Sequence, residues 1–585
     1  MKSIKETMKV TSITLAHIND THSYFEPTSL QLTLDINGKR LTPFVSAGGF
    51  ARIATRVQQL RDDAFRMGKG FIFLHAGDCF QGTLYFSLFK GKANADMLNA
   101  IGLDAMALGN HELDMGNEPV AVFTKRTNFP LLCGNWDLSQ ERENKIHRLS
   151  DNDSIKSFNP TLGCANWITK RVDGSEDDSE IAIFGLSLDK MVDIANPDSD
   201  TPFINALETA KRTVEQIHYS GINKIILLSH LGYEADKELA RQVDGIGVIV
   251  GGHSHVLQGD FSALGLETQE EYGQRINNTY VVQSGLYALA LGHCQIDFDQ
   301  EGKVVKFAGR NELLLGRRLF LDASMSEAGS DYTHMQACEH INNHPNVVVC
   351  KKDPEVQGIL LNKYIPRVRE LQSQMIAEVQ DSLRHVRIPD EQGPSQLAPL
   401  VAQSFVHAMR ERGHEVQFAI HNAGGVRTSI QPGKLSVADI AGKLLPFAVP
   451  IGVYSVNGKT IALTLEGAIN NAINNGIEGT GSGSYPYTHN LSFSYQADKP
   501  LGQRITDLKI RIGNEWQLVE SEEFYCGTSS AYTMKGKEGY DAITAMHGEG
   551  YVSNVSMADA FISLLMDQPD LLNSRPLEQR HSHLL

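Results

Sequence analysis

The sequence predicts an α/β protein with two large domains, and three observations support this prediction. The chain has 585 residues, which is too long for one ordinary hydrophobic core. Its first half alternates short β-rich segments with helix-like ones. Several β-rich segments end in a cluster of polar residues, as expected for an α/β sheet whose functional groups lie at the carboxyl ends of its strands.

Six apolar segments in the first half have the length and composition of buried strands. They span residues 13–17, 71–74, 105–108, 181–184, 224–228 and 248–250. Helix-like segments lie between them, for example residues 93–101 and 206–218. This alternation predicts the sheet and the helices of the first domain.

The pattern changes near residue 353, where DPEVQGILLNKYIPRVRELQSQ (353–374) predicts one longer helix. An Asp-Pro pair is a helix start signal, and Pro366 is expected to kink the helix because proline has no backbone N–H. Segment 321–349, just before it, has no clear pattern, so we expect an irregular insertion there.

The remainder of the chain predicts a second α/β or α+β domain. Strand-like segments lie at residues 416–421, 449–456 and 505–512, and a helix-like segment lies at 459–471. We therefore expect two domains, at residues 12–350 and 376–585, joined by a linker helix at residues 351–375.

The composition excludes several classes of protein. A hydrophobic content of 41% with 21% charged residues is typical of a soluble globular protein. The net charge of −16 disfavours a nucleic-acid polymer or an anionic membrane as partner, so we expect a small-molecule partner. The seven cysteines form no CxxC pair, which indicates reduced thiols. The first residues lack the apolar segment of a signal peptide, and we expect a cytoplasmic protein; the sequence leaves the oligomeric state open.

Five polar clusters that follow apolar strands contain residues able to bind metal. They are HINDTH (17–22), HAGD (75–78), GNHELD (109–114), SHLG (229–232) and GGHSH (251–255). The candidate ligands are Asp20, His22, Asp78, Asn110, His230, His253 and His255. A mixture of imidazoles, carboxylates and one amide suits two divalent ions, Zn²⁺ or Mn²⁺, and one carboxylate can bridge both. A further HSH, at 581–583, follows no predicted strand, and we expect it to be a disordered polar tail.

The order D-x-H, G-D, G-N-H-E-x-D, H, G-H-x-H resembles that of the calcineurin-like metallophosphoesterase superfamily, over residues 12–300. The whole chain resembles the two-domain 5′-nucleotidase/UDP-sugar hydrolase branch of that superfamily. The resemblance implies a four-layer α/β/β/α catalytic domain, an interdomain helix and a C-terminal α/β substrate-binding domain. It also implies that Asp20, His22 and His255 hold one metal ion, that Asn110, His230 and His253 hold the other, and that Asp78 bridges both.

By the same resemblance, His111 binds no metal but faces the phosphoryl group, and Asp114 orients it. The chemistry is reasonable, because phosphoryl transfer gathers charge on oxygens that a positioned imidazolium stabilises. A neighbouring carboxylate would raise the pKa of the imidazole and fix its tautomer. Glu112 is expected to make supporting hydrogen bonds and not to act on the substrate.

The second domain contains HNAGGVR (421–427), LPF (445–447) and SSAYTMKGKEGYDAI (529–543), which are similar to segments of the nucleotidase branch. The resemblance implies that Arg427 contacts phosphate, Asn422 contacts the base, Phe447 and Tyr532 sandwich the base, and Glu538 binds ribose hydroxyls. Where many relatives carry phosphate-binding arginines, this chain has PSQLAPL (394–400). Arg384 or Arg387 would have to take their place.

These features predict an enzyme of nucleotide catabolism that hydrolyses phosphate esters of nucleotides, with a hydroxide held by two metal ions as the nucleophile. Three alternatives with the same chemistry stay open: a 2′,3′-cyclic nucleotide phosphodiesterase, a UDP-sugar diphosphatase and a hydrolase of sulfur esters. A catalytically inactive nucleotide-binding protein is the alternative of another class. It would be expected to have lost a metal ligand or His111, and the full set is present.

Overall fold

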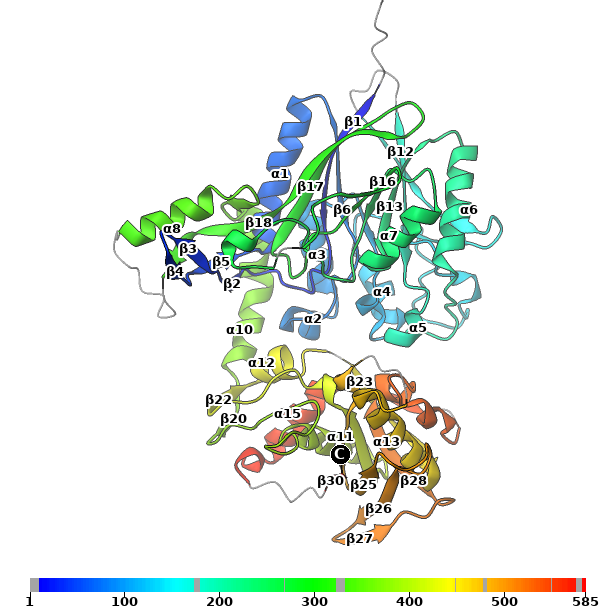
Figure 1. Ribbon diagram of the computed structural model, residues 1–585. Helices are drawn as coiled ribbons and strands as arrows, with labels where there is room; N and C mark the ends of the chain where they lie inside the picture. The colour runs from blue at the N-terminus through cyan, green and yellow to red at the C-terminus, as the bar shows by residue number, and fades with distance from the viewer. Residues whose placement is uncertain are drawn as a thin grey trace, which may run out of the picture. The chain divides into compact units, whose positions relative to one another are not determined.

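The computed structural model describes residues 10–172, 179–267, 269–321, 332–447, 449–476, 481–548, 550–574 and 581–584. It divides the chain into two compact units (Figure 1). The first unit comprises Met1–Gln81, Phe89–Val192 and Pro197–Ile365. The second comprises Pro366–Leu585 together with the short segments Gly82–Leu88 and Asp193–Asn196.

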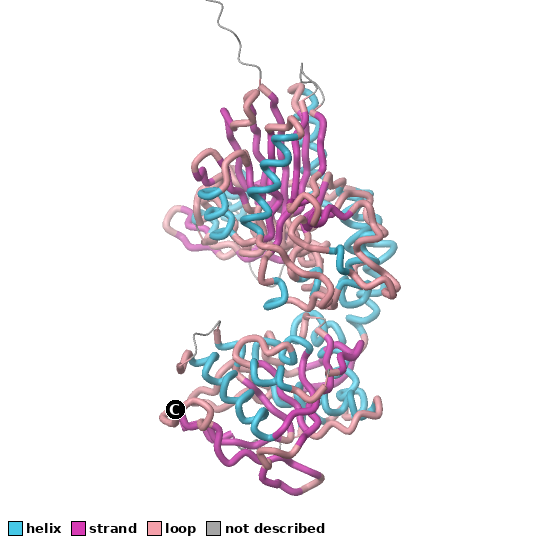
Figure 2. Tube along the Cα trace, turned by 90° about the vertical axis from the view of Figure 1, so that its right-hand side faces the viewer, coloured by secondary structure: helices cyan, strands magenta, loops and turns pink. Residues whose placement is uncertain are grey.

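Two β-sheets form the centre of the first unit, and Figure 2 shows its strands gathered together. The larger sheet runs in the order β10 (Cys164–Ala165), β9 (Ile155–Asn159), β8 (Leu131–Cys133), β7 (Ala105–Ala107), β6 (Gly70–His75), β1 (Thr11–Ile18), β17 (Ala290–Phe298), β18 (Val304–Phe320), β5 (Phe44–Ala47) and β2 (Thr28–Gln31), with β19 (Val347–Val349) beside β18. The smaller sheet runs in the order β11 (Ile168–Arg171), β12 (Glu180–Ser187), β13 (Lys224–His230), β14 (Val248–Val250), β16 (Thr279–Val282) and β15 (Gln274–Ile276). A separate hairpin joins β3 (Leu34–Ile36) to β4 (Lys39–Leu41).

The two sheets are packed face to face, with helices on their outer faces. Ile13 and Leu74 of the larger sheet share one buried cluster with Ile183, Ile226 and Val250 of the smaller one. Helices α1 (Phe50–Arg66) and α3 (Lys92–Ile101) accompany the larger sheet, while α6 (Ala206–Tyr219) and α7 (Tyr233–Gln242) cover the smaller one. The layers are therefore α/β/β/α, and this prediction is confirmed.

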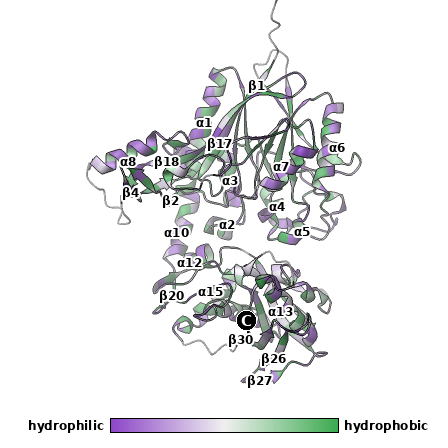
Figure 3. Cartoon of the chain, viewed as in Figure 1, coloured by the Kyte–Doolittle hydropathy of each residue, from purple (hydrophilic) through white to green (hydrophobic). Residues whose placement is uncertain are grey.

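The outer helices are amphipathic, which explains their positions. In α1 the buried residues Phe50, Ile53, Val57, Leu60 and Ala64 recur every three or four positions, so they lie on one face of the helix. Figure 3 shows hydrophilic and hydrophobic residues interspersed along α1 and α6. Shorter helices in the first unit are α4 (Asn117–Thr124) and α8 (Tyr332–Asn342). All but the last residue of helix α2 (Leu84–Phe89) and the second half of α5 (Met191–Ile194) fall in the short segments that are grouped with the second unit.

The strand directions bring the predicted clusters to one edge of the two sheets. Strands β1, β6 and β7 are parallel neighbours, and so are β13 and β14. Their carboxyl ends therefore lie at the same edge. Each polar cluster includes or follows the last residues of one of these strands: HINDTH, HAGD, GNHELD, SHLG and GGHSH.

The second unit contains its own sheets and helices. Its five-stranded sheet runs in the order β24 (Pro486–His489), β21 (Phe418–Asn422), β28 (Phe524–Ser530), β23 (Pro450–Asn457) and β29 (Tyr551–Ser556). A four-stranded sheet consists of β27 (Glu515–Leu518), β26 (Ile505–Ile512), β25 (Leu491–Gln496) and β30 (His581–Leu584), and β20 (Met375–Val379) pairs with β22 (Gly433–Ser436). The main helices are α11 (Ala398–Glu411), α13 (Gly458–Ile473) and α15 (Met557–Asp567).

The predicted helix at 353–374 exists, and a π-helical turn lies just before Pro366, where a kink was expected. It consists of α9 (Pro354–Ile359), one wider π-helical turn (Leu360–Tyr364) and α10 (Ile365–Ser373). Asp353 caps it by accepting from the backbone N–H groups of Glu355 and Val356. The π-helical turn ends just before Pro366, and such a turn accommodates a residue that cannot donate an intrahelical hydrogen bond.

Two expectations were wrong. The segment 321–349 is not irregular throughout, because α8 and β19 lie in its described part, and residues 322–331 lie outside the described residues. The HSH segment near the end is not a disordered tail: it lies in β30, whose backbone pairs in parallel with β25. These three elements depend on tertiary partners and carry little local signal. Within the described residues no helix is long and apolar enough to span a membrane.

Candidate metal-binding active site

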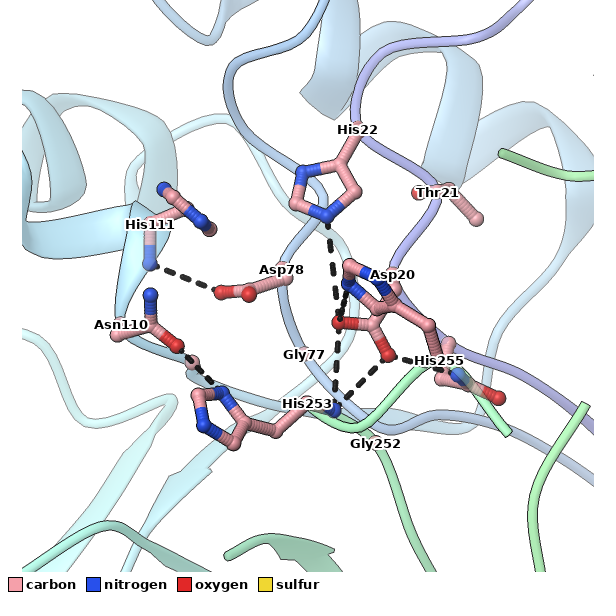
Figure 4. A network of polar contacts seen from close by, with 12 residues as sticks. Asp20, Thr21, His22, Gly77, Asp78, Asn110, His111, Gly252, His253 and His255 are labelled. Carbon is pink, nitrogen blue, oxygen red and sulfur yellow. Dashed lines mark hydrogen bonds and ion pairs between the residues drawn. The ribbon is translucent and has the colours of Figure 1, made fainter. Parts of the chain in front are cut away.

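All seven predicted metal ligands come together at the carboxyl edge of the sheets, and Figure 4 labels all of them except His230. Potential ligand atoms form two compact groups, each with its atoms within 4.8 Å of one another. Asp20, His22 and His255 form the first group, and Asp78, His230 and His253 form the second. The first group has the three residues expected at one ion, whereas the second combines His230 and His253 with Asp78, the carboxylate expected to bridge both ions.

In the first group the imidazoles of His22 and His255 both approach the Asp20 carboxylate. The distance to Asp20 Oδ1 is 4.0 Å from His22 Nε2 and 3.4 Å from His255 Nε2. Asp20 and His22 are buried, while His255 is partly exposed. Three donor atoms therefore surround one small volume that is open on the His255 side.

In the second group the Asn110 amide joins the histidines as expected. Its Oδ1 lies 2.9 Å from His253 Nδ1 and 3.3 Å from His230 Nε2. Asp78 Oδ2 lies 3.1 Å from His230 Nε2, and its Oδ1 accepts a hydrogen bond of 2.9 Å from the backbone N–H of His111. His230 donates from Nδ1 to the carbonyl of Ala76 at 2.7 Å, so its Nε2 is the atom turned toward the ligand group.

Two buried carboxylates give the site a concentrated negative charge. Burial by itself would raise the pKa of Asp78, but the charges of His230 and His111 hold it well below its usual value. For Asp20, burial is likewise offset, chiefly by the hydrogen bond from His255 and by the charge of His230. Both groups stay ionised at neutral pH, and buried carboxylates of this kind need cationic partners.

Five of the predicted ligands have a strained backbone. Positive φ angles occur at Asp20 (48°), His22 (45°), Asp78 (57°), His253 (72°) and His255 (60°). Non-glycine residues adopt this conformation uncommonly, and such strain tends to cluster at functional sites. The strain shows that the loops are shaped to aim these side chains.

Glycine at position 109 is required by the ligands around it. A Cβ atom on Gly109 would lie 2.3 Å from Asp78 Oδ1 and 2.7 Å from His230 Nε2. Any side chain there would displace one ligand of the second group. The first residue of GNHELD must therefore be a glycine for steric reasons.

His111 stands beside both ligand groups without belonging to either. Its Nδ1 is 2.7 Å from Asp114 Oδ2, and its ring edge meets the His22 ring at a centroid distance of 5.2 Å. Burial would lower the pKa of His111, but the negative charges of Asp114 and Asp78 raise it to about 10. These negative charges favour the protonated form of the imidazole, and the contact with Asp114 fixes the orientation of its ring.

Glu112 has the supporting position that was expected. Its carboxylate accepts from four backbone N–H groups, those of Asp78, Cys79, Phe80 and Gly109, at 2.7–3.0 Å. It is buried and joins the loop of Asp78 to the loop of Asn110. Glu112 therefore fixes the positions of two predicted ligands without contacting a metal group itself.

Replacing Glu112 with glutamine is expected to destabilise the protein by about 3 kcal/mol, because an amide nitrogen would then oppose buried N–H donors. Urea unfolding of the metal-free protein would measure the change. The matched control is Glu118→Gln, at an exposed position of α4, which should change stability by less than about 0.5 kcal/mol. Equal stability of the two variants would contradict this account.

Several residues at the site were not assigned from the sequence. His75 ends β6, and its Nε2 is 2.8 Å from Thr21 Oγ1, which ties together the first two loops. Asp236, on α7, accepts from Ser229 Oγ at 2.5 Å, next to His230. His75 was visible within HAGD, whereas Asp236 lies in the first turn of a helix, outside the five polar clusters, and gave no signal.

The predicted nucleoside-binding residues lie in the second unit, where Arg427 contacts Phe447 and Tyr532 contacts Glu538. The Arg427 guanidinium lies over the Phe447 ring, 5.3 Å from its centroid. Burial and the neighbouring carboxylate of Glu538 raise the pKa of Tyr532. Asn422 ends β21 and accepts from Thr533 Oγ1, beside Tyr532, at 3.5 Å. Glu538 has a positive φ of 54°, which places it with the strained residues of the chain.

The two candidate replacement arginines differ in their surroundings. Arg384 forms an ion pair with Asp390 and donates to the Gly393 carbonyl, so its own loop engages it. Arg387 is exposed and lies close enough to His385 that, after burial, its charge is the main cause lowering the pKa of His385 to about 4. Arg427 acts on the same imidazole, so Arg387 and Arg427 share one neighbourhood.

A third group of potential ligands, His407, Glu411 and Asp567, lies in the second unit. His407 Nε2 is 2.9 Å from Asp567 Oδ2, and this ion pair links α11 to α15. The carboxylates are largely exposed, unlike those of the first unit. An interhelical ion pair explains this group without a metal.

The donor atoms of the two groups in the first unit fit two divalent ions. Each group offers imidazole nitrogens and carboxylate oxygens, and the second adds one amide oxygen, with no thiolate among them. Such mixed nitrogen and oxygen donors suit Zn²⁺ and Mn²⁺ better than Ca²⁺ or Cu⁺.

Comparisons with known proteins agree with this geometry. Residues 13–257 match the family model described as calcineurin-like phosphoesterase, and residues 375–545 match that of the 5′-nucleotidase C-terminal domain. The chain is 31% identical to a probable 5′-nucleotidase of Treponema pallidum, over 91% of this chain and 87% of that protein.

Two further relatives cover nearly the whole chain. The NAD 5′-nucleotidase of Haemophilus influenzae is 27% identical over 97% of this chain and 92% of that protein. The crystal structure of a 5′-nucleotidase precursor from Thermus thermophilus matches with a TM-score of 0.65 at 27% identity, covering 98% of this chain and 99% of that one.

Proposed function

The chain belongs to the two-domain 5′-nucleotidase family of phosphoesterases, and we propose that it hydrolyses phosphate esters of nucleotides with the help of two divalent metal ions. One observation carries the proposal: two groups of largely buried potential ligands lie side by side, and the imidazole of His111, which belongs to neither group, lies beside them. Asp20, His22 and His255 would hold one ion, and Asn110, His230 and His253 the other, with Asp78 between them.

When bound, the two ions would polarise the phosphoryl oxygens and lower the pKa of a water molecule toward neutrality. The residues of the chain then have separate tasks. His111, held by Asp114, would place a positive charge against the phosphoryl oxygens as negative charge develops there. Glu112 and Gly109 keep the loops in the geometry that this requires.

The second unit would recognise the nucleoside. Phe447 and Tyr532 offer aromatic faces for a base, Asn422 offers an amide, and Glu538 would accept from ribose hydroxyls. Arg427 would contact phosphate, and Arg387, which lies in the same neighbourhood, would replace the arginines missing at 394–400. Stacking contributes affinity without requiring one particular base.

Replacing Tyr532 with alanine is expected to raise KM for nucleoside monophosphates about tenfold, because a base loses one stacking partner. The KM for glycerol 2-phosphate, which has no base, should be unchanged, and so should the metal content. Tyr551→Ala, at an exposed tyrosine of β29, is the control. Equal effects of the Tyr532 change on both substrates would show that Tyr532 does not contact the base.

A hydrolysis screen tests the proposed function. Purified protein with Mn²⁺ or Zn²⁺ would be offered nucleoside monophosphates, 2′,3′-cyclic nucleotides, UDP-sugars and a generic aryl phosphate. We expect release of phosphate from nucleoside monophosphates. Preference for a cyclic nucleotide or a UDP-sugar would instead identify the protein as a 2′,3′-cyclic nucleotide phosphodiesterase or a UDP-sugar diphosphatase. Binding of nucleotides without hydrolysis under any metal would overturn the proposal.

We also propose that the protein acts in the cytoplasm. All seven cysteines are free, and five of them are buried, which supports a reducing compartment. Fractionation of cells that express the native gene would test this, and recovery outside the cytoplasm would contradict it.

A further inference from the structure

We propose that Tyr24 and Tyr287 form an aromatic subsite beside the metal-ligand groups of the first unit. It would contact the group esterified to the phosphoryl when that group presents a planar ring close to phosphorus, as in an aryl ester. This inference rests on the proposed function, because it extends the same site. No residue of the predicted nucleoside-binding set takes part in it.

The two tyrosine rings are stacked on each other, and one of them reaches a predicted metal ligand. Their centroids are 4.2 Å apart and their planes differ by 25°. The Tyr287 ring then meets the His22 ring at 5.8 Å, with an interplanar angle of 68°. His111 meets the same His22 ring at 5.2 Å. Tyr287 and His111, the histidine predicted to face the phosphoryl group, thus both contact the His22 ring.

The backbone of Tyr287 is tied directly to the first ligand group. Its N–H donates to the carbonyl of Asp20 at 2.9 Å. Tyr287 has φ of 58° and Ala288 has φ of 55°, two consecutive residues in the left-handed region. Neither residue has the short polar side chain that usually makes this conformation acceptable. In this respect the segment resembles the strained segments that carry Asp20, His22, Asp78, His253 and His255.

The Tyr287 ring offers free surface to a ligand. Tyr287 is 36% exposed, while Tyr24, behind it, is half-buried and supports the ring from one side. A partly exposed aromatic ring beside a polar cluster suits a planar ring better than a flexible alkyl chain. The distance to His22 limits the ligand to one whose ring lies within a few bonds of the phosphoryl group.

Binding of two phosphonates tests the subsite without any turnover. Calorimetric titration of the Mn²⁺-loaded protein would compare phenylphosphonate with methylphosphonate, which differ only in the ring. We expect wild-type protein to bind phenylphosphonate about tenfold more tightly. Tyr287→Ala should abolish this preference while methylphosphonate affinity stays within twofold, and Tyr287→Phe should keep the preference.

The outcomes separate a ligand contact from a purely structural role. If Tyr287→Ala weakens both phosphonates equally, or lowers the metal content, the ring only supports His22 and the proposal is wrong. An unchanged preference in Tyr287→Ala would also overturn it. Failure of wild-type protein to hydrolyse any phosphate ester, with the ring preference present and dependent on Tyr287, would contradict the proposed function but not the aromatic contact.

Discussion

His111→Ala is expected to lower kcat on a nucleoside monophosphate about 10²- to 10⁴-fold while the protein keeps both metal ions. The His111 imidazole belongs to neither group of potential metal ligands but lies beside both. Its Nδ1 is 2.7 Å from Asp114 Oδ2, and this contact fixes the orientation of the ring. Its removal would therefore take away the positive charge that the proposed mechanism places against the phosphoryl group. Steady-state kinetics together with metal analysis by mass spectrometry would measure both parts of this expectation.

The control for this experiment is His218→Ala, at an exposed histidine in the last turn of α6. It should leave turnover and metal content unchanged. If His111→Ala lost a metal ion, the residue would be a ligand and its assigned role would be wrong. A large rise in KM with unchanged kcat would instead show that His111 binds substrate and transition state equally.

The fold and much of the site could be predicted because local signals and topology agree. Segments 13–17, 71–74 and 224–228 are apolar enough to be strands, and they form β1, β6 and β13. Parallel strands must end at a common edge, so polar residues that follow them were expected to meet. The structure does bring together the side chains from all five polar clusters.

The residues that escaped prediction depend on contacts between distant parts of the chain. Tyr287 lies in a segment without other candidate ligands, and its ring contacts with Tyr24 and His22 and its backbone bond to Asp20 place it at the site. Asp236 faces Ser229 from a neighbouring helix. The strand of His581 to Leu584 forms because its backbone pairs with β25, and backbone pairing leaves little trace in such a polar sequence.

Glu112 and Asp114 are the two carboxylates of GNHELD, and different tasks were expected of them: supporting hydrogen bonds for Glu112 and orientation of His111 for Asp114. The structure separates them, because Asp114 contacts the His111 ring while Glu112 accepts four backbone hydrogen bonds. The two carboxylates have different partners because their side chains leave the short helical turn at 111–113 in different directions. The order of residue types alone does not specify these directions.

Asp78→Asn is expected to give the largest loss of metal, because Asp78 is the carboxylate shared by the two predicted ion sites. The asparagine keeps the shape of the side chain but removes a buried negative charge that faces His230 at 3.1 Å. Breaking a buried charge interaction costs about 3–5 kcal/mol, which corresponds to about 10²- to 10⁴-fold in kcat/KM if the transition state loses it in full. Metal analysis after dialysis should find fewer than two ions per chain.

The metal content decides whether Asp78 acts through the ions. Asp62→Asn, which removes an exposed carboxylate of α1, should keep two ions and full activity. Added Mn²⁺ at millimolar concentration should partly restore activity to Asp78→Asn, since excess metal compensates for weaker binding. Two retained ions with full activity in Asp78→Asn would contradict the shared role. If Asp78→Asn kept two ions but had low activity, Asp78 would act through the hydrogen bond that it accepts from the backbone N–H of His111. That bond holds the loop that carries the His111 imidazole.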